Sequence, residues 1–329
     1  MHERNKGRGI VGLFIIWMFV FGFLLICVGG CKNQTKLFTV GILNGPPGLK
    51  SCVEGFKAGM VELGYIEGKN IRYIYNGSID TKEEVIDAEI KNLLSQDIDL
   101  LFTTGNEVTI RAKKILEGTD MPVVFGASSM VKEQGIISDL SHPGGNITGV
   151  QAANSLTKAL EWMSIIIPGV KKVYLPYNPD DSLSIVTLEQ LNNYKPQKGI
   201  ELFVQKIHSI EETISTIEKM SDIDAVLRIP CPTLDNRNSE LSQIAVKRRL
   251  PLVAIYPFDE TVLITLGSEI SDMGEQAARI VHQIRLGVKP ADLPVETAQV
   301  YFTINLKTAE KIGVYVPDDI LAQAKKIIR

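Results

Sequence analysis

The chain has 329 residues, 45% of them hydrophobic and 22% charged, a composition that excludes a disordered, collagenous or coiled-coil protein. Its 35 Lys and Arg residues nearly balance 38 Asp and Glu residues, so that the net charge is −3. Nucleic-acid binding requires a concentrated positive surface, and this balance argues against it. The length suffices for two lobes of ordinary size, each with its own hydrophobic core.

The first thirty residues have the composition of an export signal. A basic cluster precedes Gly9–Gly30, an uncharged apolar run that is long enough to cross a bilayer as one helix. The run ends in Val28-Gly29-Gly30-Cys31, which resembles the lipobox of bacterial lipoproteins, where the cysteine receives a diacylglycerol and becomes the new N-terminus. We therefore predict a signal peptide over 1–30, lipidation of Cys31 and a short tether over 31–36. The alternative is an uncleaved signal anchor, and both interpretations place the rest of the chain outside the cytoplasm.

After the tether, short apolar runs alternate with segments of helical hydrophobic spacing. In the first series, continuous apolar runs typical of buried parallel strands cover residues 37–43, 71–75, 100–103, 123–126 and 147–150. Helices are predicted around residues 53–63, after a capping box formed by Thr81 and Glu84, and over 108–116. This series predicts one α/β lobe.

A second series of the same kind follows. Strands are predicted over 172–177, 202–207, 225–229, 252–256, 262–266 and 300–304, and helices over 156–167, 182–194, 211–220, 239–248, 273–286 and at the C-terminal end. Such alternation predicts an α/β fold with parallel sheets and right-handed crossovers. The predicted first lobe comprises 37–150 plus about 263–290, and the second comprises 151–262 plus about 291–329. Ligands of open α/β sheets bind beyond the carboxyl ends of the strands, so we expect a binding cleft between the lobes.

Catalytic and metal-binding motifs are absent from the sequence. None of the four His residues pairs with another His or a Cys at metal-ligand spacing, and no nucleophile-elbow or dinucleotide motif occurs. Cys52 and Cys231 are far apart in sequence and are predicted to be isolated thiols packed within the fold, with a disulfide between them outside the cytoplasm as the alternative. These observations favour a binding protein without a cofactor over an enzyme, although carboxylates distant in sequence can still act together.

Polar side chains directly follow the predicted strand ends in both series. Short hydroxyls and free N–H groups at helix starts suit an anionic group such as a carboxylate, and acids near them suit an ammonium. Each cluster alone is more often a helix cap, but five clusters on one cleft favour a small-molecule site. The predicted ligand-binding residues are Asn44, Thr104, Gly105, Asn106, Ser128, Ser129, Asn178, Ser182, Thr233, Tyr256 and Asp259.

Several stretches resemble a known family. The most specific are Glu62–Asn70 (ELGYIEGKN), His142–Gly149 (HPGGNITG), Arg249–Tyr256 (RLPLVAIY), Lys289–Glu296 (KPADLPVE) and Ile304–Ala309 (INLKTA). From about residue 38 to the C-terminus the chain is similar to ABC-transporter substrate-binding lipoproteins of the tryptophan/tyrosine-type group.

The resemblance implies the type I periplasmic binding protein fold, in which two Rossmann-like lobes are joined by three crossings. In this chain the crossings are expected near 151–155, 259–262 and 289–294. The resemblance further implies an amino-acid-like small ligand that closes the lobes, and a membrane permease that recognises the closed form.

The sequence departs from the family pattern at ligand positions. Thr104-Gly105 replaces a common Thr-Pro, Ser128-Ser129-Met130-Val131 replaces Ser/Thr-Asp-Pro-Val, and Pro230-Cys-Pro-Thr233 replaces Pro-Thr-Asp-Asn. The identity of the ligand therefore stays open. So do two alternative roles, a ligand sensor that partners a membrane histidine kinase or receptor and an extracytoplasmic enzyme.

Overall fold

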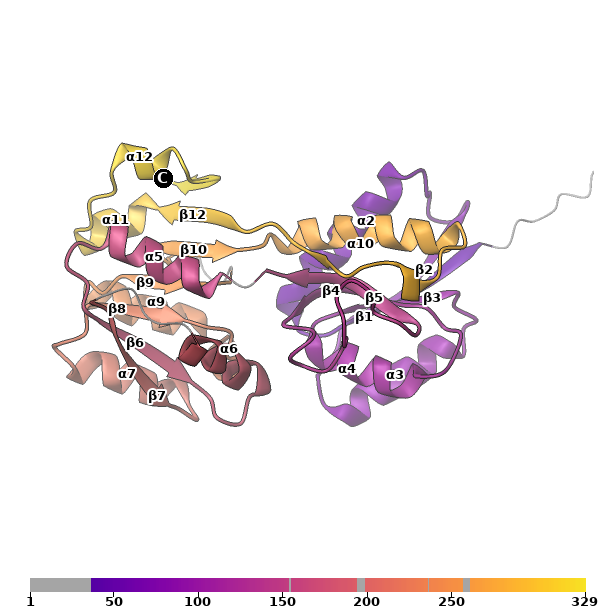
Figure 1. Cartoon of the computed structure of the whole chain (residues 1–329), viewed down its shortest axis with the longest axis horizontal. Helices are drawn as coiled ribbons and strands as arrows, with labels where there is room; N and C mark the ends of the chain where they lie inside the picture. The colour runs from indigo at the N-terminus through magenta and orange to yellow at the C-terminus, as the bar shows by residue number, and fades with distance from the viewer. Residues whose placement is uncertain (1–36, 154, 194–198, 236, 257–260) are drawn as a thin grey trace, which may run out of the picture. The chain divides into compact units, whose positions relative to one another are not determined.

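The computed structural model describes residues 37–153, 155–193, 199–235, 237–256 and 261–329. Within these ranges the chain forms two α/β lobes, each built on one sheet (Figure 1). The predicted signal peptide and tether, with Cys31, lie outside the described residues. In the ranges described, no helix combines the length and apolar character needed to span a bilayer.

The first lobe contains a six-stranded sheet in the order β11-β5-β4-β3-β1-β2, and all of its paired strands are parallel. Its central strands are buried along most of their length, as a parallel sheet covered on both faces requires. The strands are β1 (Phe38–Asn44), β2 (Ile71–Ser78), β3 (Leu100–Thr104), β4 (Val123–Ser129), β5 (Ile147–Ala152) and β11 (Glu296–Thr297).

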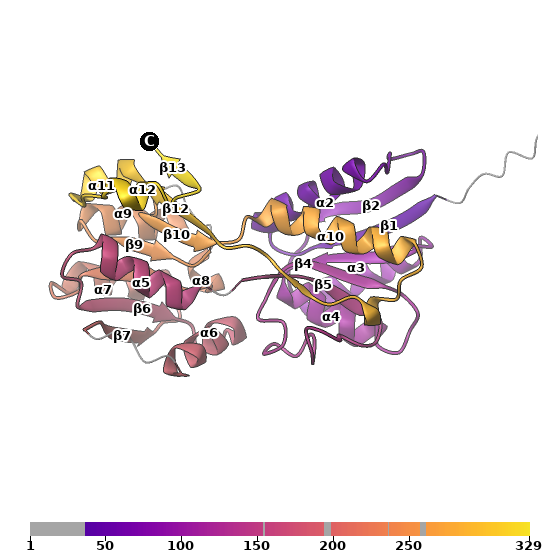
Figure 2. The ribbon, with the colours of Figure 1, turned by 45° about the horizontal axis from the view of Figure 1, so that its top comes forward.

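Two helices cover each face of this sheet. One core cluster joins the sheet to α2 (Lys50–Glu62) and α10 (Ile270–Arg285), and another joins the opposite face to α3 (Glu83–Leu94) and α4 (Asn106–Leu116). The views in Figure 1 and Figure 2 show α2 and α10 side by side. The short 3-10 helices of this lobe are η1 (Pro47–Leu49) and η2 (Pro290–Asp292).

The contact between α2 and α10 depends on glycine. A Cβ on Gly274 would lie 2.0 Å from the carbonyl oxygen of Cys52, and one on Gly55 would lie 2.1 Å from that of Ser271. Both distances are far below van der Waals contact, so the two backbones approach as closely as only glycine permits. A helix from late in the chain thereby completes the lobe that the N-terminal half begins.

The second lobe contains a seven-stranded sheet in the order β13-β12-β10-β9-β8-β6-β7. Its pairs are parallel except that β12 runs antiparallel to β10. The strands are β6 (Lys172–Tyr177), β7 (Glu201–Lys206), β8 (Ala225–Arg228), β9 (Leu252–Ala254), β10 (Ile264–Gly267), β12 (Tyr301–Asn305) and β13 (Lys326–Ile328).

Helices also pack on both faces of the second sheet, around two core clusters. The helices of the first cluster are α5 (Leu156–Ile166), α6 (Ser182–Asn193), α11 (Leu306–Ile312) and α12 (Asp318–Leu321). Those of the second are α7 (Ile210–Lys219), α8 (Pro232–Asp235) and α9 (Asn238–Lys247). The predicted α/β fold with two lobes of mainly parallel sheet is therefore confirmed.

Strand pairing corrects the lobe boundaries that the sequence suggests. The strand at 264–267, expected in the first lobe, is β10 and pairs with β9 and β12 of the second sheet. Conversely, Glu296–Thr297, expected in the second lobe, forms β11 and pairs with β5 of the first sheet. The second and third crossings thus follow β10 and β11, near residues 268–269 and 298–300, rather than 259–262 and 289–294.

Three smaller expectations are resolved by the structure. Cys52 and Cys231 are buried free thiols, as predicted. The Thr81/Glu84 capping box is wrong, because α3 begins at Glu83 after Lys82, which has no side-chain cap. The C-terminal end is not wholly helical, since the last segment forms the edge strand β13.

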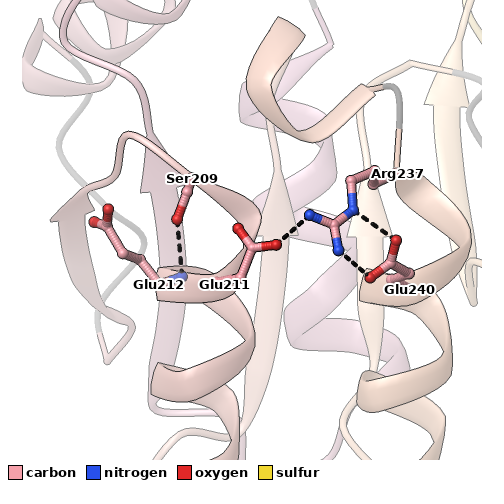
Figure 3. A network of polar contacts seen from close by, with 5 residues as sticks. All are labelled: Ser209, Glu211, Glu212, Arg237 and Glu240. Atoms are coloured by element: carbon pink, nitrogen blue, oxygen red, sulfur yellow. Dashed lines mark hydrogen bonds and ion pairs between the residues drawn. The ribbon is translucent and has the colours of Figure 1, made fainter.

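An ion-pair network joins the starts of α7 and α9 on the second lobe (Figure 3). The Arg237 guanidinium donates to both carboxylate oxygens of Glu240 at 2.6 Å and also to Glu211. Ser209 caps α7 by accepting a hydrogen bond from the Glu212 backbone N–H at 3.4 Å. These hydrogen bonds from Arg237 hold the pKa of Glu211 and of Glu240 below the usual glutamate range.

Candidate functional site

The carboxyl end of β4 carries local backbone strain. Ala127 and Met130 have φ values of 52° and 53°, in the left-handed region that non-glycine residues rarely adopt. The register of β4 against β5 shifts between Phe125 and Ser128, so a bulge lies in the same stretch. Strained residues of this kind cluster at ligand clamps, and they single out Ser128 and Ser129 as a candidate site segment.

The start of α4 fixes this strained segment. The Asn106 side-chain amide donates to the carbonyl oxygen of Ser129 at 2.9 Å, and its oxygen accepts from the Ser129 N–H at 2.8 Å. The Thr109 hydroxyl lies 3.3 Å from that of Ser128 and donates to the carbonyl of Gly105 at 2.6 Å. Asn106 and Thr109 of α4 therefore hold the end of β4 in place from within the lobe.

The ends of β1 and β3 are joined in the same way. The buried Asn44 accepts a hydrogen bond from the Thr104 hydroxyl and donates to Ser78 Oγ at 2.6 Å. Gly105 follows with a φ of 96°, which favours glycine, and is the N-cap residue of α4. These predicted site residues form a buried polar layer under the carboxyl edge of the first sheet.

In the second lobe, polar residues after β6 and β8 contact one another. Asn178 Nδ2 donates to the Thr233 hydroxyl at 2.6 Å, and Asn178 Oδ1 accepts from the Asp180 N–H at 2.8 Å. The Ser184 hydroxyl of α6 donates to the carbonyl of Pro230 at 2.9 Å, so the first turn of α6 is tied to the loop after β8. The loop and α6 are thus held as one surface.

Two of the crossing segments are linked by hydrogen bonds. The Ala153 N–H donates to Ser268 Oγ at 3.4 Å, and the Ser155 hydroxyl donates to the carbonyl of Leu266 at 2.5 Å. Ser155 and Ser268 are both buried. The segment that leaves the first sheet after β5 and the segment that returns to the first lobe after β10 therefore lie side by side.

A pocket that is open to solvent lies at the carboxyl ends of these strands. Residues from both lobes and from both linked crossings line it: Ser129, Met130, Ala152, Ala153, Leu183, Thr187, Pro230, Ile255, Tyr256 and Ser268.

The pocket walls are mainly apolar. Met130, Leu183 and Ile255 supply aliphatic surface and Tyr256 an aromatic ring, while the side chains of Ser129, Thr187 and Ser268 supply hydroxyls. None of the lining residues within the described ranges carries a formal charge. This surface suits a small molecule with an apolar body and a few hydrogen-bonding groups. In the described parts of the chain, no cluster of three or more His, Cys, Asp or Glu side chains could hold a metal ion.

The predicted site residues divide into three groups. Ser129 and Tyr256 line the pocket. Asp259 lies outside the described residues. The others do not line this pocket, and for most of them the structure shows internal hydrogen bonds instead: Asn44, Thr104, Gly105, Asn106, Ser128, Asn178, Ser182 and Thr233.

The sequence-based prediction misses most of the pocket wall. Ser268 follows β10 directly, so the rule that located hydroxyls after strand ends would have found it. Met130, Leu183 and Ile255 carry no such signal, because an apolar residue beside a strand end is indistinguishable in sequence from a core residue. Their exposure to a pocket appears only once the fold is known.

Residues 39–328 match the sequence profile of the family described as ABC transporter substrate binding protein. The match spans nearly all of the chain beyond the predicted signal and tether. This chain belongs to the ABC transporter substrate-binding protein family. Members of the family are substrate-binding proteins.

Individual relatives are distant in sequence but similar in fold. A tyrosine-binding protein of Clostridioides difficile (strain R20291) is 23% identical over 257 residues, 76% of this chain and 73% of the relative. A Streptococcus pneumonia ABC domain in complex with L-Trp matches 89% of this chain and all of its own at TM-score 0.77 and 22% identity. A ligand-free, open substrate-binding protein with adhesive properties from Clostridium difficile covers 89% of this chain and 99% of its own, with TM-score 0.73 and 21% identity. The fold is accordingly the type I periplasmic binding protein fold.

Proposed function

We propose that this family member is the lipid-anchored, extracytoplasmic receptor of an ABC importer, and that it binds an amino-acid-like molecule with an apolar side chain in the pocket. The pocket is the observation that carries the proposal, because apolar surface, hydroxyls and both lobes meet there. A ligand that contacts both lobes favours one arrangement of them over others, and a permease can recognise that arrangement.

The relatives support the class of ligand. One is named for tyrosine and another was solved with L-Trp, both of which combine an apolar side chain with the ammonium and carboxylate of an amino acid. In the pocket, Tyr256, Met130 and Ile255 would contact the side chain of such a ligand, and the hydroxyls of Ser129, Thr187 and Ser268 its polar end.

Calorimetric titration of residues 33–329 with tryptophan, tyrosine, phenylalanine and the branched amino acids tests the proposal. We expect saturable binding of at least one of them and a matching rise in melting temperature, because a ligand that binds only the folded state stabilises it. Glutamate and lysine are the controls, since the described wall offers no charged partner to a charged side chain. A flat titration with every apolar amino acid would contradict the proposed ligand class.

The pocket itself is tested by Tyr256→Ala. Loss of a ring that lines the pocket should weaken binding about tenfold or more, because burial of an aromatic side chain is worth more than 1.4 kcal/mol. Tyr315→Ala is the matched control, since Tyr315 is 77% exposed and lines no part of the pocket. Equal affinity of the two variants would place the ligand elsewhere.

A further inference from the structure

One end of the first lobe carries an unusual share of exposed apolar side chains. Among the described residues, nine large hydrophobic side chains are exposed, and four of them belong to two neighbouring segments. Val61 and Ile66 lie at the end of α2 and just beyond it, and Leu286 and Val288 follow α10. We call these four residues the end patch. Their exposed fractions are 62%, 48%, 71% and 38%.

Contacts between aromatic and basic residues bring the two segments together. The Tyr65 hydroxyl lies 2.9 Å from His282 Nδ1, which connects the turn after α2 to the last turns of α10. The Tyr65 ring lies 6.5 Å from that of Phe38, and the Arg285 guanidinium lies 5.3 Å from the centre of the Phe38 ring. Phe38 is the first residue of β1, so the end patch surrounds the point where the chain enters the fold. Figure 1 and Figure 2 both show the start of β1 beside the end of α10.

The length of chain before Phe38 determines what this surface faces. Six residues separate Cys31 from Phe38, and the seven Cα–Cα steps between them span about 25 Å at most when the chain is fully extended. Lipid attached to Cys31 would hold Phe38 within that distance of the bilayer, and an uncleaved signal anchor would do the same. At so short a reach the effective concentration of the membrane near the patch is high.

The charges beside the patch suit a headgroup layer. Lys69, Arg285 and Lys289 are exposed basic residues in the same two segments, and basic side chains attract anionic lipids. Of the acids nearby, Glu62 is exposed as well, and Glu67 forms an ion pair with Lys57 at 3.9 Å. We infer that the end patch rests on the membrane surface, with its apolar side chains among the headgroups of anionic phospholipids. This inference rests on the membrane attachment in the proposed function.

Fluorescent labelling of the full chain in vesicles tests the inference. The chain is reconstituted into phosphatidylglycerol/phosphatidylethanolamine vesicles that contain nitroxide-labelled lipid, with a fluorophore on Val61→Cys or Leu286→Cys. Buried Cys52 and Cys231 are 0% exposed and do not compete for the label. Ile165→Cys and Tyr315→Cys, which replace residues of the second lobe that are 54% and 77% exposed, are matched controls.

We expect nitroxide quenching several-fold stronger at positions 61 and 286 than at 165 and 315. In the labelled Val61→Cys chain, Leu286→Glu should lower the docking equilibrium about tenfold, whereas Ile165→Glu should not change it. Equal quenching at all four positions in a chain that stays on the vesicles would contradict membrane contact by the end patch, but not the membrane attachment itself. Release of the chain from the vesicles would overturn the membrane attachment, and the end patch with it. Labelling of Cys31 in the parent chain would overturn its lipidation. Binding of amino acids is a separate readout that neither result changes.

Discussion

At the scale of single residues, burial explains the state of the two thiols. Cys52 is fully buried beneath α10, and burial raises the pKa of its thiol because a thiolate cannot be solvated there. Cys231 is equally inaccessible. We expect neither thiol of residues 33–329 to react with a disulfide reagent in the native state, and both to react in urea. Rapid reaction of one thiol without denaturant, followed spectrophotometrically, would contradict this burial.

Single residues also show how far the sequence predicts the site. The rule that polar groups follow strand ends selected Ser129 and Tyr256, which line the pocket. The rule could not separate ligand contacts from internal contacts, because Asn and Thr serve both purposes. Asn106 and Asn178 are bonded to Ser129 and Thr233 of the protein itself. Only three-dimensional contacts distinguish these roles.

At the scale of elements, the α2–α10 contact is the most demanding packing in the first lobe. Gly274→Ala would force a Cβ against the backbone of Cys52, and such overpacking costs about 1–3 kcal/mol of folding stability. Urea unfolding should show this loss. Gly48→Ala is the control, because nothing lies within 4 Å of its Cβ position and its φ is not in the left-handed region. A Gly274→Ala protein as stable as Gly48→Ala would mean that the helices can separate freely.

The ion-pair network around Arg237 makes a pH-dependent contribution to the folding stability of the second lobe. Its hydrogen bonds lower the pKa of Glu211 and Glu240 in the folded chain, so the unfolded chain binds protons at a higher pH. The stabilisation is therefore complete above the unfolded glutamate pKa of about 4.3 and is lost as the pH falls through the folded values.

The urea midpoint of unfolding should decrease between about pH 6 and about pH 3. This decrease should be larger for the parent protein than for Arg237→Gln. Lys91→Gln removes the same charge from an exposed position of α3 and should behave like the parent. An equal fall in all three proteins would show that the network adds nothing measurable.

The comparison of predicted and observed strands also shows how far the sequence predicts the fold. Hydrophobic spacing identified almost every strand, including β6 at its observed bounds. It did not predict the short strands β11 and β13, and it placed β10 in the wrong lobe, because hydrophobic spacing does not specify which sheet a short strand joins. That choice depends on partners such as β9 and β5, which are distant in sequence.

At the scale of the whole molecule, the proposed lipid anchor depends on Cys31. Growth with labelled palmitate should label the parent chain and Cys27→Ser, and should leave Cys31→Ser unlabelled, because the lipobox modifies only the cysteine at its end. Cys27 is the control because it lies within the apolar run of the signal. Label in Cys31→Ser would exclude this site.

The late position of α10 has a consequence for biosynthesis. A nascent chain that has emerged only as far as β5 contains five strands of the first sheet, but its helix α2 has no partner for the face that Gly274 later contacts. That face stays uncovered until α10, starting at Ile270, has left the ribosome. The first lobe also needs β11, which ends at Thr297, so it cannot reach its final stability until about nine tenths of the polypeptide has been translated. If residues 1–30 act as the predicted export signal, they emerge from the ribosome long before the first lobe can be completed.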